Sequence, residues 1–146
     1  MILSDVSVMV AALRPDHPHH DLAADWYDAA HGSGDLAISS LVIAGTLRVL
    51  TNRRIFVEPT PLKAAVAAIS AVLEQAPLVH PGARHWEILA RLCEASGVVG
   101  GDISDAQHAA LALEFDATWV TTDSDFGCFP GLRWTNLLTG ETHRNV

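Results

Sequence analysis

The chain has 146 residues, of which 49% are hydrophobic and 18% charged, and it carries a net charge of -8 at neutral pH. A chain of this length and apolar content can bury an ordinary core, so we expect a single domain over residues 1–146 and exclude a disordered protein. The acidic charge argues against a broad DNA-binding surface, but not against a nuclease whose carboxylates hold a divalent cation.

The first half of the chain alternates strand-like and helix-like segments. Met1 to Val10 is an apolar run typical of a buried parallel strand. Ser40 is the expected N-cap of a helix, and Pro61 fits the first turn of another. The expected elements are a strand that ends at Asp5 or just beyond, a helix over His17–Ala30, a strand over Asp35–Ser39, a helix over Leu41–Leu50 and a helix from Pro61 to about Gln75.

The second half continues the same alternation. Its expected elements are a strand at Leu78–Val79, a helix over Arg84–Ser96 that stops at Gly97, a helix over Ile103–Phe115, a strand over Trp119–Thr122 and a strand over Arg133–Leu138. Strands and helices that alternate at this spacing favour an α/β fold with a parallel sheet covered on both faces. Ligands of such folds bind at the carboxyl ends of the strands.

Three aspartates fall where such a site is expected. Asp5 and Asp123 each follow an apolar strand, so both project from the same edge of the sheet. Asp105 lies in the first turn of a helix, where capping explains it equally well. Together the three acids predict an oxygen-only site for Mg²⁺ or Mn²⁺, and the chemistry of such a site is phosphodiester hydrolysis.

Four sequence motifs carry a resemblance to a known family. They are Asp-Val-Ser at residues 5–7, LVIAGTLRVLTN at 41–52, DISDAQHAALA at 102–112 and TTDSDF at 121–126. In this order they resemble the PIN-domain family and, within it, the VapC toxins of bacterial toxin–antitoxin pairs. The similarity extends over nearly the whole chain, to about Leu138.

The resemblance implies a three-layer α/β/α sandwich with a central, mainly parallel sheet. It also implies a Mg²⁺-dependent endoribonuclease that acts on structured RNA and is neutralised by a VapB-type antitoxin whose tail covers the acidic pocket. Asp5 and Asp105 correspond to direct metal ligands, Asp123 to an acid that holds water or a second metal, and Asp125 to a weaker candidate. Ser7 stands where the family usually has Asn. We also expect a cytoplasmic homodimer that does not enter a membrane.

Gly45 departs from the family pattern, because relatives usually carry an acid at this helical position. A glycine inside a helix costs about 0.5–1 kcal/mol relative to alanine, so it needs a reason. One reason is close packing of the helix against the sheet, and the other is the loss of an acid. Loss of the acid predicts attenuated cleavage and stronger activity in a Gly45→Glu variant. It also keeps open a non-catalytic PIN module that binds antitoxin or RNA without cutting.

The basic residues near the expected site have two interpretations. Arg48, Arg53 and Arg54 lie on and after the helix that contains Gly45, and they are candidates for contacts with RNA phosphates. Arg48 is equally suited to hold a carboxylate of the site. A phospho-accepting receiver domain also gathers acids at a strand end, but it needs a lysine there, and Lys63 is the only lysine and lies in a middle helix.

Several other residue types are expected to be structural. The histidines at positions 17, 19 and 20 precede a helix without zinc-type partners, so we expect exposed loop residues. The two cysteines have no CxxC spacing, and we expect buried thiols at Cys93 and Cys128. The four tryptophans are expected in the core: Trp26, Trp86, Trp119 and Trp134.

Overall fold

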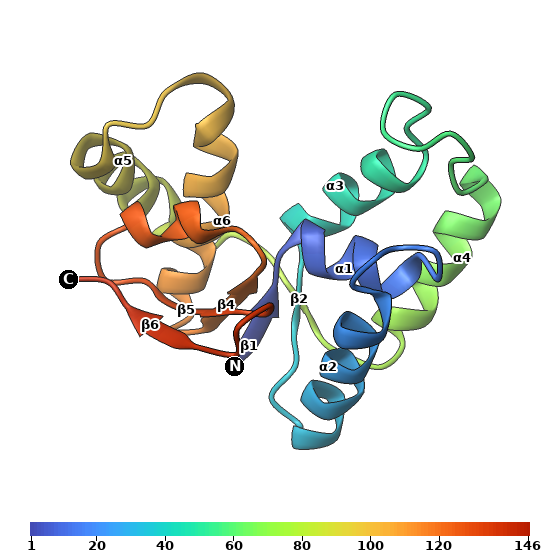
Figure 1. Cartoon of the computed structure of the whole chain (residues 1–146). Coiled ribbons are helices and arrows are strands. Elements are labelled where there is room, and N and C mark those ends of the chain that lie inside the picture. Colours follow the sequence, from blue (N-terminus) through green and yellow to red (C-terminus); the bar gives the residue numbers. More distant parts are fainter.

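The computed structural model describes residues 1–146 as a mainly parallel sheet with helices packed against both faces (Figure 1). In chain order the elements are β1 (Ile2–Ser4), α1 (Val6–Leu13), α2 (His20–Ser33), β2 (Ile38–Ser39), α3 (Ser40–Leu50), α4 (Leu62–Leu73), β3 (Leu78–Val79), α5 (His85–Ser96), the 3-10 helix η1 (Gly100–Asp102), α6 (Ile103–Glu114), β4 (Thr118–Thr121), the 3-10 helix η2 (Ser124–Cys128), β5 (Arg133–Asn136) and β6 (Thr142–Arg144). The α/β fold expected from the sequence is confirmed.

The strands run in the spatial order β3-β2-β1-β4-β5-β6. Strands β1, β4, β5 and β6 form one hydrogen-bonded sheet, and β2 and β3 form a short pair. A parallel bridge between Ile2 and Leu36 joins the pair to β1. All pairings are parallel except that of β5 with β6. The carboxyl ends of β1 and β4 therefore lie side by side at one edge.

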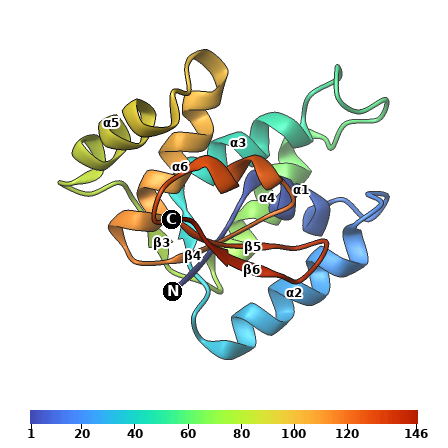
Figure 2. The same cartoon turned by 60° about the vertical axis from the view of Figure 1, so that its left-hand side comes forward.

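Alternate residues of β4 face the two helical layers. Trp119 is fully buried and packs on the side of α6, where the ring of His108 stacks on it. The next residue, Val120, packs with Val8 and Ala23 of α1 and α2 on the opposite face. Figure 2 shows α5 and α6 on one side of the strands and α2 on the other. The chain thus has the helix–sheet–helix layers expected for its fold class.

The first strand is shorter than the apolar run predicted. It ends at Ser4, and residues 6–13 form α1, a helix that the sequence analysis did not predict. Asp5 caps this helix, because its side chain accepts a hydrogen bond of 2.7 Å from the Val6 backbone N–H. An apolar run alone does not separate a buried strand from a buried helix, and here the capping carboxylate decides where the change occurs.

Other element boundaries also differ in detail. Ser39 rather than Ser40 caps α3, since its hydroxyl accepts from the Leu41 N–H. Pro61 precedes α4 instead of lying in its first turn. The last strand, β6, was not predicted, because its exposed polar residues lack a hydrophobic pattern. Gly97 ends α5 in a left-handed conformation with φ of 73°, as expected.

Two predictions about burial were wrong. Trp86 lies on the outer face of α5 with 74% of its surface exposed, whereas Trp119 and Trp134 are buried as predicted. Cys128 is exposed and Cys93 is partly buried, so neither is a fully buried thiol. Residue type gives only an average preference for the core, and the face of the helix decides the individual case. None of the helices is both long and apolar enough to cross a membrane.

Candidate active site

Asp5 and Asp123 lie at the same edge of the sheet, as the sequence predicted. Strands β1 and β4 pair with Ser4 opposite Val120, so Asp5 leaves its strand beside Thr121. The Thr121 hydroxyl donates a hydrogen bond of 2.6 Å to Asp5 Oδ2. The same hydroxyl accepts a bond of 3.0 Å from the Asp123 backbone N–H. Thr121 therefore links the two acidic segments.

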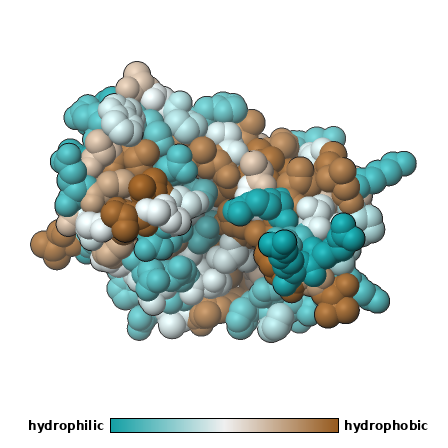
Figure 3. Space-filling view, turned by 90° about the horizontal axis from the view of Figure 1, so that it is seen from above, coloured by the Kyte–Doolittle hydropathy of each residue, from teal (hydrophilic) through white to brown (hydrophobic).

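Asp105 joins Asp5 from the first turn of α6. Both line a cavity of about 430 Å³, here called the Asp5 cavity, between the carboxyl edge of the sheet, α3 and α6. Its other lining residues are Val6, Leu41, Ala44, Gly45, Arg48, Ser104, Gln107 and His108. Figure 3 looks down on the molecule from above, where hydrophilic and hydrophobic groups alternate without one continuous apolar face. Only three of the ten residues that line the Asp5 cavity are hydrophobic, so the cavity is suited to a polar ligand.

A second hollow of about 410 Å³ lies on the other side of Asp105. Asp102, Asp125 and Cys128 line it together with Asp105. Asp105 is thus shared between the two hollows, and it is the residue that connects Asp125 to the acids of the Asp5 cavity.

The electrostatics of Asp105 show that the acids act on one another. Burial, followed by the negative charges of Asp5 and Asp123, raises the pKa of Asp105 to about 6. Burial also raises the pKa of Asp5, and the hydrogen bonds from Thr121 and the Val6 N–H oppose that change. Crowded carboxylates of this kind are stabilised in their charged form by a bound cation. The donor set consists of oxygen atoms, which Mg²⁺ and Mn²⁺ prefer.

The three predicted ligands do not form a preassembled metal centre. No group of three acidic, histidine or cysteine side chains is arranged closely enough to enclose an ion. One oxygen of Asp123 accepts the Asp125 backbone N–H at 2.8 Å and caps η2. Asp5 and Asp105 are the two acids that line the Asp5 cavity. That number fits Mg²⁺, which commonly binds one or two carboxylates and completes its shell with water and phosphate.

The remaining predicted residues divide between the cavity and the surface. Arg48 lines the Asp5 cavity and makes no ion pair with any carboxylate. Arg53 and Arg54 are exposed in the segment after α3 and do not line this cavity. The Ser7 hydroxyl is enclosed and has no hydrogen-bond partner within the chain. The histidines 17, 19 and 20 are exposed or partly exposed, as predicted.

Gly45 of α3 packs against Val6 of α1, and not against the sheet as one interpretation of the sequence had it. A Cβ atom built at this position would be 2.8 Å from Cγ2 of Val6, which is shorter than carbon atoms tolerate. The side chain of Val6 is β-branched and stiff, so it cannot turn aside freely. The contact gives Gly45 a packing role. Attenuated cleavage through a missing acid stays a prediction.

The sequence analysis missed three residues of this edge. Thr121 directly holds Asp5, and its position at the end of a strand, just before the acidic segment, was the available signal. Asp102 lies one helical turn before Asp105 and lines the second hollow. His108 lies one turn after Asp105 in the Asp5 cavity, and only the spacing along α6 pointed to it.

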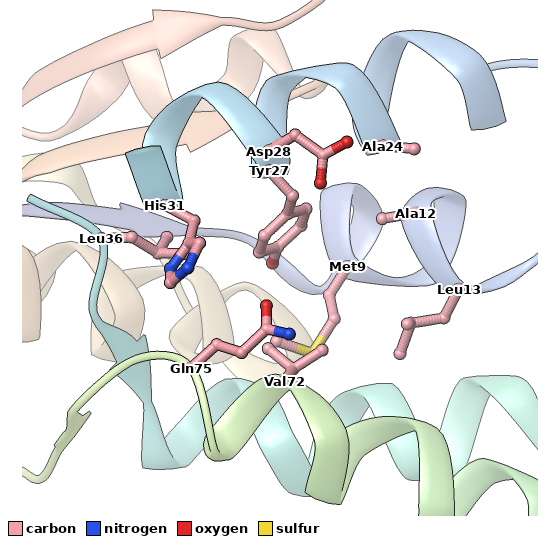
Figure 4. A pocket seen from close by; sticks show the side chains of 10 residues that line it. All are labelled: Met9, Ala12, Leu13, Ala24, Tyr27, Asp28, His31, Leu36, Val72 and Gln75. Carbon is pink, nitrogen blue, oxygen red and sulfur yellow. The ribbon is translucent and has the colours of Figure 1, made fainter. Parts of the chain in front are cut away.

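An apolar cavity of about 170 Å³ lies apart from these acids, between α1, α2 and α4. In Figure 4 the ring of Tyr27 projects from α2 toward Val72 and Gln75, with Met9 beside it. Its ionisable side chains are Tyr27, Asp28 and His31, of which only Asp28 is a carboxylic acid. The cavity lacks the paired carboxylates of the Asp5 cavity and does not belong to the candidate active site.

The crowding of the acids predicts how stability depends on pH. The folded pKa of Asp105 is about 6, against an ordinary value of 3.8. Between these values the folded protein holds a proton that the unfolded chain has released, so this contribution to stability is lost as the pH rises. We expect thermal unfolding in a chelator to show this loss, and Mg²⁺ to restore stability at neutral pH. In an Asp105→Asn variant, both effects are expected to shrink, and unchanged effects would contradict the crowding.

Comparisons with known proteins identify the family of this chain. The PIN-domain family matches residues 2–130. The chain is 40% identical to the VapC ribonuclease Mb2897 of Mycobacterium bovis, over 98% of this chain and 99% of that protein. It is 39% identical to the ribonuclease VapC25 of Mycobacterium tuberculosis, over 91% of this chain and 96% of the relative. The crystal structure of VapBC2 from Rickettsia felis, bound to a DNA fragment from their promoter, superimposes with a TM-score of 0.71 at 21% identity, covering 92% of this chain and 97% of that one. The chain therefore belongs to the PIN-domain family and, within it, to the VapC ribonucleases.

Proposed function

We propose that this ribonuclease hydrolyses RNA at the Asp5 cavity, with Asp5 and Asp105 as the ligands of a Mg²⁺ or Mn²⁺ ion. One observation carries the proposal: carboxylates that are 100 residues apart in the sequence line one cavity, and the charge of Asp5 helps to raise the pKa of Asp105. On this proposal the PIN domain occupies the whole chain, residues 1–146. The acidic net charge is then compatible with a nuclease, since the bound cation attracts phosphate.

The residues around the two ligands have distinct tasks in the proposed reaction. A bound divalent cation supplies polarisation of the phosphate and activation of water. Thr121 and the Val6 N–H each donate to one oxygen of Asp5 and so fix its orientation. Asp123, the further acid, accepts a hydrogen bond from water near the edge. Arg48 is the only arginine or lysine that lines the cavity, and it binds the RNA phosphate.

The direct test is cleavage of labelled RNA by the purified chain with Mg²⁺, with Mn²⁺ and with a chelator. We expect metal-dependent cleavage that the chelator abolishes and that an Asp5→Asn variant lacks. Equal cleavage by the wild-type chain and the Asp5→Asn variant would contradict the proposed site and would indicate a contaminating nuclease.

Removing the hydroxyl that holds Asp5 is expected to weaken metal binding. Thr121→Val keeps the size and branching of this buried side chain but deletes the 2.6 Å donor to Asp5. Loss of a partner that orients a metal ligand typically costs about 10- to 100-fold in metal affinity or activity. Calorimetric titration with Mn²⁺ measures the affinity, and Thr118→Val, in the same strand but away from Asp5, is the control. Equal affinities in the two variants would exclude this role for Thr121.

We also propose a VapB-type antitoxin and a homodimeric state for this chain. The name of the similar VapBC2 structure supports an antitoxin as the partner of this chain. Arg or Lys side chains of such a partner would complement the acids at the carboxyl edge of the sheet and compete with the cation for them. Co-expression with the antitoxin encoded beside this gene tests the proposal: we expect a stable complex with inhibited cleavage. Sedimentation of the isolated chain as a monomer would contradict the homodimer.

A further inference from the structure

His108 is a buried imidazole in the wall of the Asp5 cavity. It follows Asp105 by one turn of α6, so both residues lie on the same helix face. Only 7% of its surface is exposed. The structure shows no hydrogen bond to either ring nitrogen, and Nδ1 is fully enclosed. Nε2 is not enclosed in this way, so it is the nitrogen that reaches the cavity.

The surroundings of His108 fix both the plane and the charge of its ring. The imidazole stacks on Trp119, with 5.2 Å between ring centroids and 18° between planes. Burial lowers the pKa of His108 to about 4, so the ring is neutral at physiological pH. A neutral imidazole has one N–H donor and one acceptor. Since an enclosed N–H without a partner is rarely tolerated, the favoured tautomer has its proton on Nε2, where the cavity can supply an acceptor.

The cavity needs neutral donors of this kind. Its acids repel RNA phosphate, and Arg48 is the only charged donor in its wall. A second arginine or lysine beside Asp105 would neutralise the ligands of the proposed metal. A neutral N–H binds an anionic oxygen without that effect.

We propose that His108 is a substrate-contacting residue, whose Nε2–H donates a hydrogen bond to a phosphate oxygen of the RNA in the Asp5 cavity. This inference rests on the proposed nuclease site. It adds a residue that determines how the RNA is held, next to the acids that hold the cation. If His108 served only to fill the core, leucine would fill the same space without burying a polar nitrogen that has no partner.

Three substitutions separate contact with RNA from core packing. His108→Leu removes both nitrogens. His108→Asn places an amide near the enclosed Nδ1 position, and His108→Gln places one near Nε2. With short random-sequence RNAs and Mg²⁺, we expect KM to rise about tenfold in the Leu and Asn variants, as for the loss of one hydrogen bond to a charged group. The Gln variant is expected to recover most of that loss.

Thermal unfolding distinguishes this effect from damage to the fold. We expect His108→Leu to keep the wild-type melting temperature or exceed it, because it removes an unpaired buried nitrogen. His31→Leu, at the apolar cavity, is the matched histidine control and should leave KM unchanged. If His108→Leu impairs folding, the KM values of His108→Asn and His108→Gln decide whether His108 contacts RNA. These two variants carry the same amide group at different distances from the backbone.

Two results would overturn the inference. One is an unchanged KM in His108→Leu, and the other is an equal rise in the Asn and Gln variants. The Asp5→Asn variant separates this failure from failure of the nuclease site. If cleavage is lost in Asp5→Asn while His108→Leu behaves as wild type, only the role of His108 is wrong. If Asp5→Asn still cleaves, the proposed active site is wrong as well.

Discussion

Asp105→Asn is expected to reduce Mg²⁺-dependent RNA cleavage by about 10²- to 10⁴-fold, which corresponds to the several kcal/mol that a correctly held cation contributes to the transition state. Asparagine has nearly the same size, so the helix and the cavity wall remain. It lacks the charge that binds the cation. Burial and then the charges of the neighbouring acids raise the pKa of Asp105, so the same substitution also relieves the repulsion between these acids. The variant should therefore be inactive but at least as stable as the wild type in a chelator.

The measurement is a single-turnover rate of cleavage at saturating Mg²⁺, together with the melting temperature. Asp28→Asn is the matched control, because Asp28 lines the apolar cavity from α2 (Figure 4) and does not line the Asp5 cavity. We expect this control to cleave at the wild-type rate. Comparable rates for Asp105→Asn and Asp28→Asn would show that Asp105 is only a helix-capping acid.

Gly45→Ala is expected to destabilise the fold by about 1–3 kcal/mol, the usual cost of overpacking, although alanine is intrinsically the better helix former. The reason is the 2.8 Å approach of the added Cβ to Val6 Cγ2. Replacing Val6 by alanine should remove this close contact. In a Val6→Ala background, Gly45→Ala should therefore lower the free energy of unfolding much less than it does in the wild type. Urea unfolding of the four proteins of this cycle measures the coupling. If the two substitutions changed the free energy of unfolding additively, α1 and α3 would accommodate the added Cβ without cost, and the packing role of Gly45 would be wrong.

The same pair of positions tests whether Gly45 marks a missing acid. Gly45 lines the cavity that Asp5 and Asp105 also line, so the carboxylate of a longer side chain there would share this cavity. We expect Gly45→Glu alone to lower the stability of the fold, because its Cβ would collide with Val6. In a Val6→Ala background, the added carboxylate is free to strengthen Mn²⁺ binding and cleavage, as the missing-acid interpretation predicts. Unchanged binding and cleavage in that background would leave packing as the sole reason for the glycine.

The sequence predicted the layers of the fold because its hydrophobic pattern repeats in both strands and helices. It also predicted that Asp5 and Asp123 share an edge, since the carboxyl ends of parallel strands meet. It did not predict α1. Residues 6–13 are mostly apolar, so their periodicity is the same for a buried strand and a buried helix. The decision depends on the Asp5 cap and on contacts with α2 and α3, which only the folded chain supplies.

The rest of the site depends on contacts between distant segments. Thr121 is an ordinary strand residue until its register with β1 places the hydroxyl against Asp5. The sequence left close packing and a lost acid as two reasons for Gly45, and the contact with Val6 of α1 supports packing. In the sequence His108 is one more polar residue of a helix. Only the folded chain stacks its ring on Trp119 and places it in the wall of the Asp5 cavity. Spacing in the sequence can bring these residues to the edge of the site, but it does not show which atoms they contact.

Crystals soaked in Mn²⁺ test the central claim most directly, because anomalous scattering locates the ion without reference to activity. We predict one strong anomalous peak in the Asp5 cavity, within bonding distance of a carboxylate oxygen from both Asp5 and Asp105. The absence of a peak there at saturating Mn²⁺, or a peak held by other side chains alone, would contradict the account.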